Sequence, residues 1–165
     1  MEKLKDLDTL YYHELKDLYD AEHQITDALP KMVEKASDDA LKTAFRNHLE
    51  ETRGQIARLE QVFELLDRKA ERETCKAMKG LLAEGEEVVK ARGESDVVDA
   101  ALIAAAQRVE HYEMSGYGTA RALAQQLGYT DQARLLQETL DEEKAADAKL
   151  NEIALSRVNT EAVTA

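Results

Sequence analysis

The sequence contains one cysteine, one proline and no tryptophan, and aromatic residues make up only 5% of its 165 residues. Because a single cysteine cannot form an intramolecular disulfide, the sequence indicates a reducing compartment. Charged residues make up 34% of the chain, and Ala, Leu, Glu and Lys recur throughout. This composition is typical of helices rather than sheets. The length is sufficient for one domain with a real core.

Long apolar segments are also missing. No run of about 18 apolar residues occurs, so the sequence contains no candidate transmembrane helix. The first 17 residues are charged every few positions and lack the apolar segment of a signal peptide. The formal net charge of -12 repels phosphate backbones and anionic lipids. We therefore expect a cytoplasmic protein that binds neither nucleic acid nor membranes.

Capping and turn signals divide the chain into four long helices and one short helix. Ser37, Asp38 and Asp39 form an N-cap cluster, and Gly128 is a C-cap glycine followed by a new N-cap. The predicted helices cover residues 3–36, 38–67, 75–90, 97–127 and 130–158, with residues 68–74 as a connection and residues 159–165 frayed.

Two helical hairpins joined by one crossover of roughly 30 residues have the ferritin-like connectivity. The predicted fold is therefore an all-α, ferritin-like antiparallel four-helix bundle whose long crossover contains a short extra helix. We expect residues 1–165 to form this single domain.

Acidic residues interrupt the apolar stripe of each long helix near its middle. In a core-facing helix the stripe recurs every three to four residues, so an acid within it points toward the core. In the second helix the acid lies in a row that flanks the stripe. The interrupting acids are Glu22 in the first long helix, Glu51 in the second, Glu110 and Glu113 in the third, and Glu143 and Asp147 in the fourth. Because mid-helix positions of antiparallel hairpins lie at one height, these six carboxylates can converge.

Converging buried carboxylates need positive charge. An isolated buried carboxylate costs several kcal/mol or more, and several together repel one another. Two divalent cations would neutralise them, and oxygen-rich ligation suits iron or manganese. The alternative is that the acids face solvent or form ion pairs with basic residues, for which Arg53, Arg108 and Lys144 are the candidates.

Several neighbouring residues bear on such a site. His48 lies one turn before Glu51 and can be interpreted as a ligand, as a partner of a ligand or as a core histidine. Tyr117 lies one turn after Glu113 and is predicted to hydrogen-bond near the acids. Gly116 costs about 1 kcal/mol relative to alanine within a helix, which indicates a close helix approach or access to the site.

Four segments carry a resemblance to a known family. The runs LYDAEHQITDALPKM, HLEETRGQIARLEQVFELL, AALIAAAQRVEHYEMSGYGT and ETLDEEKAADAKL resemble the bacterial ferritin-like stress proteins of the YciF and YciE type. Glu110 and Glu113 are also similar to the paired glutamates on the third bundle helix of rubrerythrins. The resemblance implies a dimer-forming bundle that is induced under stress and binds metal. On the wider superfamily pattern it implies ligand roles for Glu22, Glu51 and Glu143 as well.

The sequence departs from that pattern at the histidines. In the Glu-x-x-His motif of the superfamily a histidine follows the glutamate by three residues, but Gly54 follows Glu51 and Ala146 follows Glu143. Asp147 is the only substitute nearby. This departure puts the iron redox chemistry of the superfamily in question for this chain.

Two functional hypotheses follow. The first is a homodimeric stress protein that holds two divalent ions, iron in preference to manganese, with oxygen or peroxide as the small oxidant. Glu110 and Glu143 would bridge the ions, and Glu22, Glu51, Glu113 and Asp147 would be terminal ligands. The second is a metal-free structural or interaction protein without catalytic activity.

Overall fold

The computed structural model describes residues 4–164, and these residues form helices without any strand. The helices are α1 (Leu7–Lys35), α2 (Asp39–Leu65), α3 (Lys76–Lys90), α4 (Ser95–Leu127), α5 (Thr130–Ile153) and α6 (Asn159–Thr164), with a π-helical turn at Ala154–Val158 between α5 and α6. The prediction of an all-α protein with four long helices and a short helix in the crossover is confirmed, and α6 is an additional short helix.

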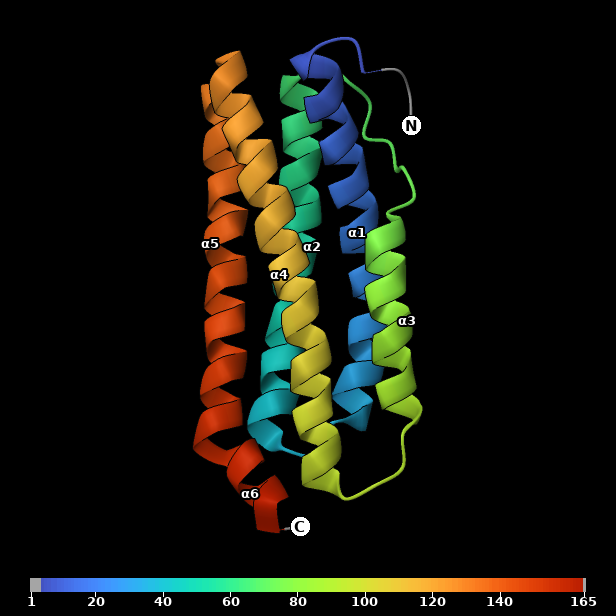
Figure 1. The fold of residues 1–165 in the computed structure, drawn as a ribbon. Coiled ribbons are helices and arrows are strands. Elements are labelled where there is room, and N and C mark those ends of the chain that lie inside the picture. The colour runs from blue at the N-terminus through green and yellow to red at the C-terminus, as the bar shows by residue number, and fades with distance from the viewer. Residues whose placement is uncertain (1–3, 165) are drawn as a thin grey trace.

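The four long helices form an antiparallel bundle (Figure 1). Around the bundle, α1 contacts α2, α2 contacts α5, α5 contacts α4, and α4 contacts α1. The crossover between α2 and α4 runs the length of the bundle on its outside, and α3 packs there against α1 and α4 (Figure 1). A crossover is needed because α2 ends at one end of the bundle and α4 begins at the other, which is the ferritin-like connectivity.

Local capping interactions fix the helix ends. The Asp6 side chain accepts a hydrogen bond from the Thr9 amide at 2.8 Å, and the Asp38 side chain accepts one from the Leu41 amide at 2.8 Å. Gly128 ends α4 with φ = 80°, a left-handed conformation that glycine adopts at little cost. The predicted caps at Asp38 and Gly128 are therefore present.

The two ends of the chain differ from the prediction. The predicted start of the first helix at Lys3 lies outside the described residues, and α1 begins only at Leu7, after the Asp6 cap. Leu4 therefore precedes the helix and is 47% exposed instead of continuing the core stripe. Residues 159–164 were predicted to fray but form α6, which packs against α4 because the π-helical turn redirects the chain and buries Val158.

The hydrophobic core has two parts, one toward each end of the bundle. The part that we call the aromatic end contains Tyr11, Tyr19, Phe63 and Tyr117 among its leucines and alanines. The part that we call the aliphatic end is built mainly from Ile, Leu, Met, Val and Ala, with Phe45 as its fully buried ring. The mid-helix carboxylates lie between the two parts.

A close helix approach explains the glycine beside Tyr117. A Cβ atom on Gly116 would lie 2.7 Å from Leu18 Cδ2, so only glycine lets α1 and α4 approach this closely with Leu18 in place.

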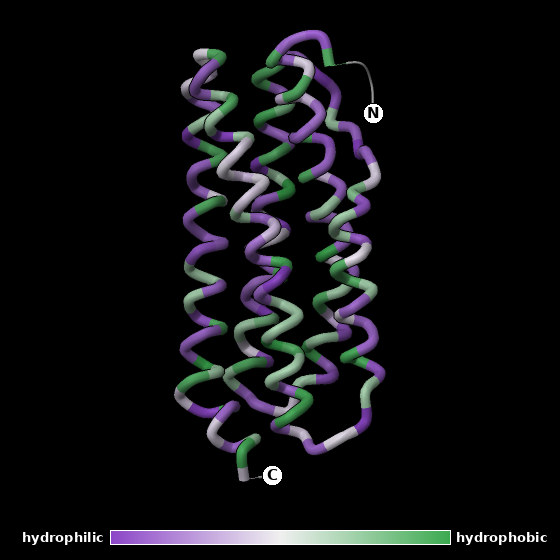
Figure 2. Tube along the Cα trace, in the orientation of Figure 1, coloured by the Kyte–Doolittle hydropathy of each residue, from purple (hydrophilic) through white to green (hydrophobic). Residues whose placement is uncertain are grey.

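Hydrophilic and hydrophobic residues alternate along each long helix (Figure 2). Among the described residues, no helix has the length and apolar character needed to cross a membrane.

Candidate metal centre

Each long helix contributes a buried polar side chain to one layer in the middle of the bundle. Glu22 comes from α1, His48 from α2, Glu110 and Glu113 from α4, and Glu143 from α5. All five side chains are buried. Ligand atoms of His48, Glu110, Glu113 and Glu143 lie within 4.8 Å of one another, which is close enough to hold a metal ion.

Burial and mutual repulsion change the protonation of these carboxyl groups. Removal from water raises the pKa of Glu22, Glu110 and Glu113 well above the ordinary value of 4.5. Repulsion from Glu143 adds to the upward pKa shift of all three groups. Without a cation, the layer can therefore lower its free energy by taking up protons.

The layer also holds most of the unpaired polar atoms of the described chain. Ten buried side-chain nitrogen and oxygen atoms in the described residues lack a hydrogen-bond partner. Eight of them are here: one atom each of Glu22, Gln55, Glu110 and Glu143, and two each of His48 and Glu113. Because a buried unpaired polar atom costs about 1–3 kcal/mol, such a concentration is compatible with cations or protons as the partners of these atoms.

A second set of residues orients the carboxylates. The Tyr117 hydroxyl donates to Glu22 Oε1, as predicted, and burial raises the pKa of Tyr117, which keeps the hydroxyl protonated as a donor. The Gln55 amide donates to Glu143 Oε1 and, at 3.1 Å, to Glu142 Oε2.

Arg58 holds Glu142, the second acceptor of the Gln55 amide, in place. Its guanidinium donates to both oxygens of Glu142 at 2.8 and 2.9 Å and to Thr139 Oγ1 at 2.7 Å. A bidentate guanidinium–carboxylate pair has a fixed geometry. The chain Arg58–Glu142–Gln55 therefore limits the rotation of the Gln55 amide that faces Glu143.

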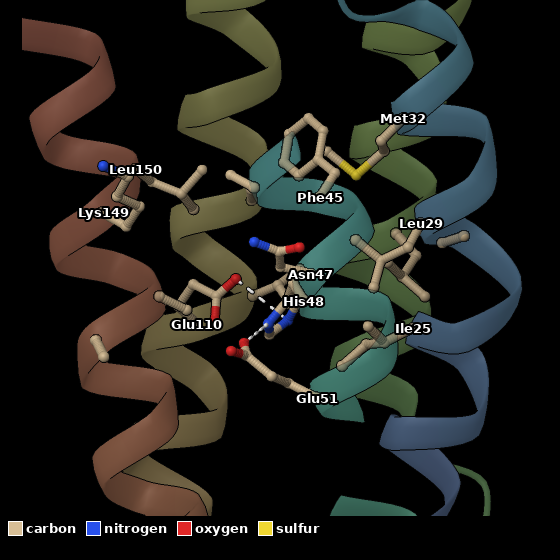
Figure 3. Close-up of a pocket in the computed structure, with 17 residues that line it drawn as sticks. Ile25, Leu29, Met32, Phe45, Asn47, His48, Glu51, Glu110, Lys149 and Leu150 are labelled. Carbon is tan, nitrogen blue, oxygen red and sulfur yellow. Dashed lines mark ion pairs between the residues drawn. The ribbon is translucent and has the colours of Figure 1, made fainter. Parts of the chain in front are cut away.

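Two of the six predicted ligands lie outside the buried cluster. The Glu51 side chain is 49% exposed, and its Oε2 lies 3.7 Å from His48 Nδ1. Figure 3 shows His48 between Glu51 and Glu110, and the distance from His48 Nε2 to Glu110 Oε1 is 3.5 Å. Asp147 is 24% exposed and is bound by Gln107 at 3.0 Å and His111 at 3.3 Å. The structure thus brings together Glu22, Glu110, Glu113 and Glu143, with Glu51 and Asp147 at the periphery.

The basic residues considered as alternative partners of the acids lie elsewhere. Arg53 is 55% exposed and pairs with Glu50, so it does not reach into the layer. Lys144 lies 3.4 Å from Asp141 on the surface of α5, and Arg108 is exposed. Among the described residues, no arginine or lysine forms an ion pair with the four buried glutamates.

The sequence did not reveal the residues that orient Glu143, which are Gln55, Glu142 and Arg58. The available signal was the position of Gln55. It lies one turn after Glu51, in the row that flanks the apolar stripe of the second helix. The pairing of Arg58 with Glu142 joins α2 to α5 and has no signature in either helix alone. The sequence allows three roles for His48, and the structure places both of its ring nitrogens near carboxylates.

Comparison with known proteins identifies the family. The profile of the domain of unknown function DUF892 matches residues 6–163. Protein YciF of Escherichia coli K12 is 49% identical over 160 residues, which cover 96% of each chain. The crystal structure of the E. coli stress protein YciF matches with a TM-score of 0.91 at 50% identity, covering 94% of this chain and 98% of that one.

Two other solved structures are similar. YcfI of Rhodopseudomonas palustris, which has been suggested to be a structural protein, matches with a TM-score of 0.89 at 46% identity, covering 91% of this chain and 96% of that one. A protein of Xanthomonas campestris pv. campestris matches with a TM-score of 0.72, covering 93% and 94% of the two chains, but at 21% identity it shows a common fold alone. On the full-length matches to the DUF892 profile and to YciF, the chain belongs to the DUF892 family.

Proposed function

We propose that this protein is a YciF-type stress protein that binds two divalent metal ions, iron in preference to manganese, in the carboxylate layer. The observation that carries the proposal is the concentration of unpaired buried atoms in this layer. The similarity to a protein described as the stress protein YciF supports the physiological setting.

The charges of the donor set fit two divalent ions. Glu22, Glu110, Glu113 and Glu143 carry four negative charges when ionised, and two divalent cations supply four positive charges. His48 adds a neutral nitrogen donor, and imidazole with carboxylate oxygens is a combination that iron accepts. A site with one histidine and four carboxylates remains oxygen-rich, which also suits manganese.

Glu110 and Glu143 are the proposed bridging residues, because they lie on the adjacent helices α4 and α5 and their carboxyl groups interact directly. Glu22, Glu113 and His48 would then be terminal ligands. Glu51 could join by a side-chain rotation from its place beside His48, whereas Asp147 would first have to leave Gln107 and His111. His48 precedes Glu51 by three residues, so it offers the nitrogen that the missing histidine of the Glu-x-x-His motif would have supplied.

A pair of such ions would supply redox chemistry toward oxygen or peroxide as the small oxidant. The protein's own residues orient the carboxylates around that chemistry. Tyr117 fixes one oxygen of Glu22 and leaves the other free, and Gln55 does the same for Glu143. On the side of the aromatic end, the apolar core limits the access of water to the layer.

Elemental analysis of protein purified without chelator from iron- or manganese-supplemented cells tests the proposal. We expect about two ions per chain and a higher melting temperature than that of the metal-free protein. The double variant Glu110→Gln/Glu143→Gln should lose both. The control variant Glu50→Gln/Glu152→Gln removes two exposed acids and should retain both. Fewer than one ion per chain in the wild type would refute the proposal.

A metal-free structural role is the second candidate, and the suggestion that YcfI is structural favours it. In that case the protein would hold protons in place of ions, and the melting temperature would not respond to iron or manganese. We further propose that the protein is cytoplasmic, consistent with its single buried cysteine, and that it forms a homodimer, as the resemblance to the YciF-type proteins implies.

A further inference from the structure

A cavity of about 160 Å³ lies next to the carboxylate layer on the side of the aliphatic end. Figure 3 shows His48 and Glu110 at one end of it and Ile25, Leu29 and Phe45 among its walls. The wall is contributed by all four bundle helices and by α3, which closes one side with Leu82. The cavity is therefore enclosed mainly by hydrocarbon and ends at polar groups of the metal centre.

Small side chains keep this space open. Ala44, Ala106, Ala145 and Ala146 line the cavity at positions where a larger apolar residue would fill it. The lining residues that are exposed to solvent are Asn47, Glu51, Ala145 and Lys149, so the opening lies between α2 and α5. A ligand can thus enter from solvent, pass this opening and reach His48.

The polar end of the cavity has unused hydrogen-bonding capacity. His48 is 6% exposed, and neither ring nitrogen has a hydrogen-bond partner within the described chain. Glu110 Oε2 is likewise unpaired. A ligand with one hydroxyl or similar group can bond here, whereas a second polar group directed at the hydrocarbon wall of Ile25, Leu29 and Phe45 would be left unpaired.

We propose that this cavity binds a small, mostly apolar molecule of about six to eight non-hydrogen atoms, with its one polar group toward His48 and Glu110. The size follows from the volume, because an apolar cavity of about 150 Å³ can bind benzene. Binding itself does not depend on metal. That the bound molecule is a substrate of the metal centre rests on the proposed function.

Titration of the metal-free protein with benzene and with phenol, followed by methyl NMR, tests the binding. We expect saturable shifts at Ile25, Leu29 and Leu150, with dissociation constants on the order of 1 mM. Phenol should also shift the ring-nitrogen signals of His48, and benzene should leave them nearly unchanged. Intermolecular NOEs between the wild-type protein and ring protons should map to the same methyl groups.

The variant Ala146→Leu fills the cavity and should weaken benzene binding at least tenfold. The matched control Ala148→Leu makes the same change two residues later, at an exposed position outside the cavity, and should bind as the wild type does. Non-saturable shifts, equal affinities in the two variants or an absence of NOEs to these methyl groups in the wild type would each overturn the proposal.

The titration of the metal-free protein is paired with elemental analysis of protein purified without chelator from iron- or manganese-supplemented cells, and the two measurements together separate the two proposals. Protein that binds benzene but retains no metal upholds the cavity site and refutes the metal centre. Protein that holds two ions per chain but shows no ring-proton NOEs upholds the metal centre and refutes the cavity site.

Discussion

The aromatic end and the carboxylate layer both bury polar groups, but they treat these groups in opposite ways. At the aromatic end, the Tyr11 hydroxyl donates to Gln132 Oε1 at 2.8 Å, and the Tyr19 hydroxyl donates to Glu60 Oε1 at 2.8 Å. In the layer, both carboxylate oxygens of Glu113 lack a hydrogen-bond partner among the described residues. The two regions lie in one bundle and in the same helices.

The difference separates buried polar groups that are paired within the protein from buried polar groups that are not. A buried hydroxyl with an acceptor contributes modestly to stability and fixes the packing of its ring. A buried carboxylate without a donor or cation lowers stability, so its presence in a folded protein calls for a compensating role. The paired groups of the aromatic end therefore support the packing of the bundle, whereas the unpaired groups of the layer are compatible with metal binding.

The largest expected effect is the pH dependence of stability in the metal-free protein. The folded-state pKa of Glu22, Glu110 and Glu113 is raised above 4.5, so the folded protein binds more protons than the unfolded chain above about pH 4.5. The free energy of unfolding should then fall as pH rises from about 5, by up to about 1.4 kcal/mol per pH unit for each such carboxyl. Urea unfolding at a series of pH values measures this change in the free energy of unfolding.

Two variants separate the contribution of the layer to this pH dependence from the general charge repulsion within an acidic protein. Glu113→Gln should flatten the slope and stabilise the metal-free protein at pH 8, and this gain should vanish below pH 4.5. Glu50→Gln removes the same charge from a side chain that is 70% exposed and should leave the slope nearly unchanged. With metal bound the trend should reverse, because the ligands must be deprotonated. Equal slopes in both variants would contradict the distinction between the regions.

A smaller effect is expected from the residues that orient the layer. Gln55→Leu removes the donor to Glu143 without adding charge and should lower metal affinity about ten- to hundredfold. Gln61→Leu is the matched control, since Gln61 lies on the same helix and is exposed. Competition with a metal-binding dye measures both affinities. If Gln61→Leu weakens binding as much as Gln55→Leu, the amide has no specific role.

Helical periodicity explains how much of this arrangement could be predicted. A straight helix with an apolar stripe determines which residues face the core, so Glu22, Glu110, Glu113 and Glu143 were identified from spacing alone. In α2 the stripe is broad, and a small rotation of the helix decides between His48 and Glu51. That rotation depends on packing against α1 and α5, which the sequence of α2 does not contain.

Contacts between helices were harder to predict. Asp147 belongs to the inner stripe of α5, yet Gln107 and His111 of α4 hold it at the edge of the layer. The pairing of Arg58 with Glu142 requires the register of one hairpin against the other. Packing between the two hairpins sets this register, and no local pattern in the sequence specifies it.

The smallest predicted effect tests the aromatic end. Tyr11→Phe leaves Gln132 Oε1 buried without its donor and should lower the free energy of unfolding by about 1–2 kcal/mol. Tyr129→Phe removes a hydroxyl that donates to Asp8 at 2.8 Å in a half-buried position, where water can replace it, so the loss should be a few tenths of a kcal/mol. Urea unfolding compares the two. We expect Glu113→Gln to stabilise the protein at pH 8. If Tyr11→Phe did so as well, the buried polar groups of the aromatic end would be no better paired than those of the layer.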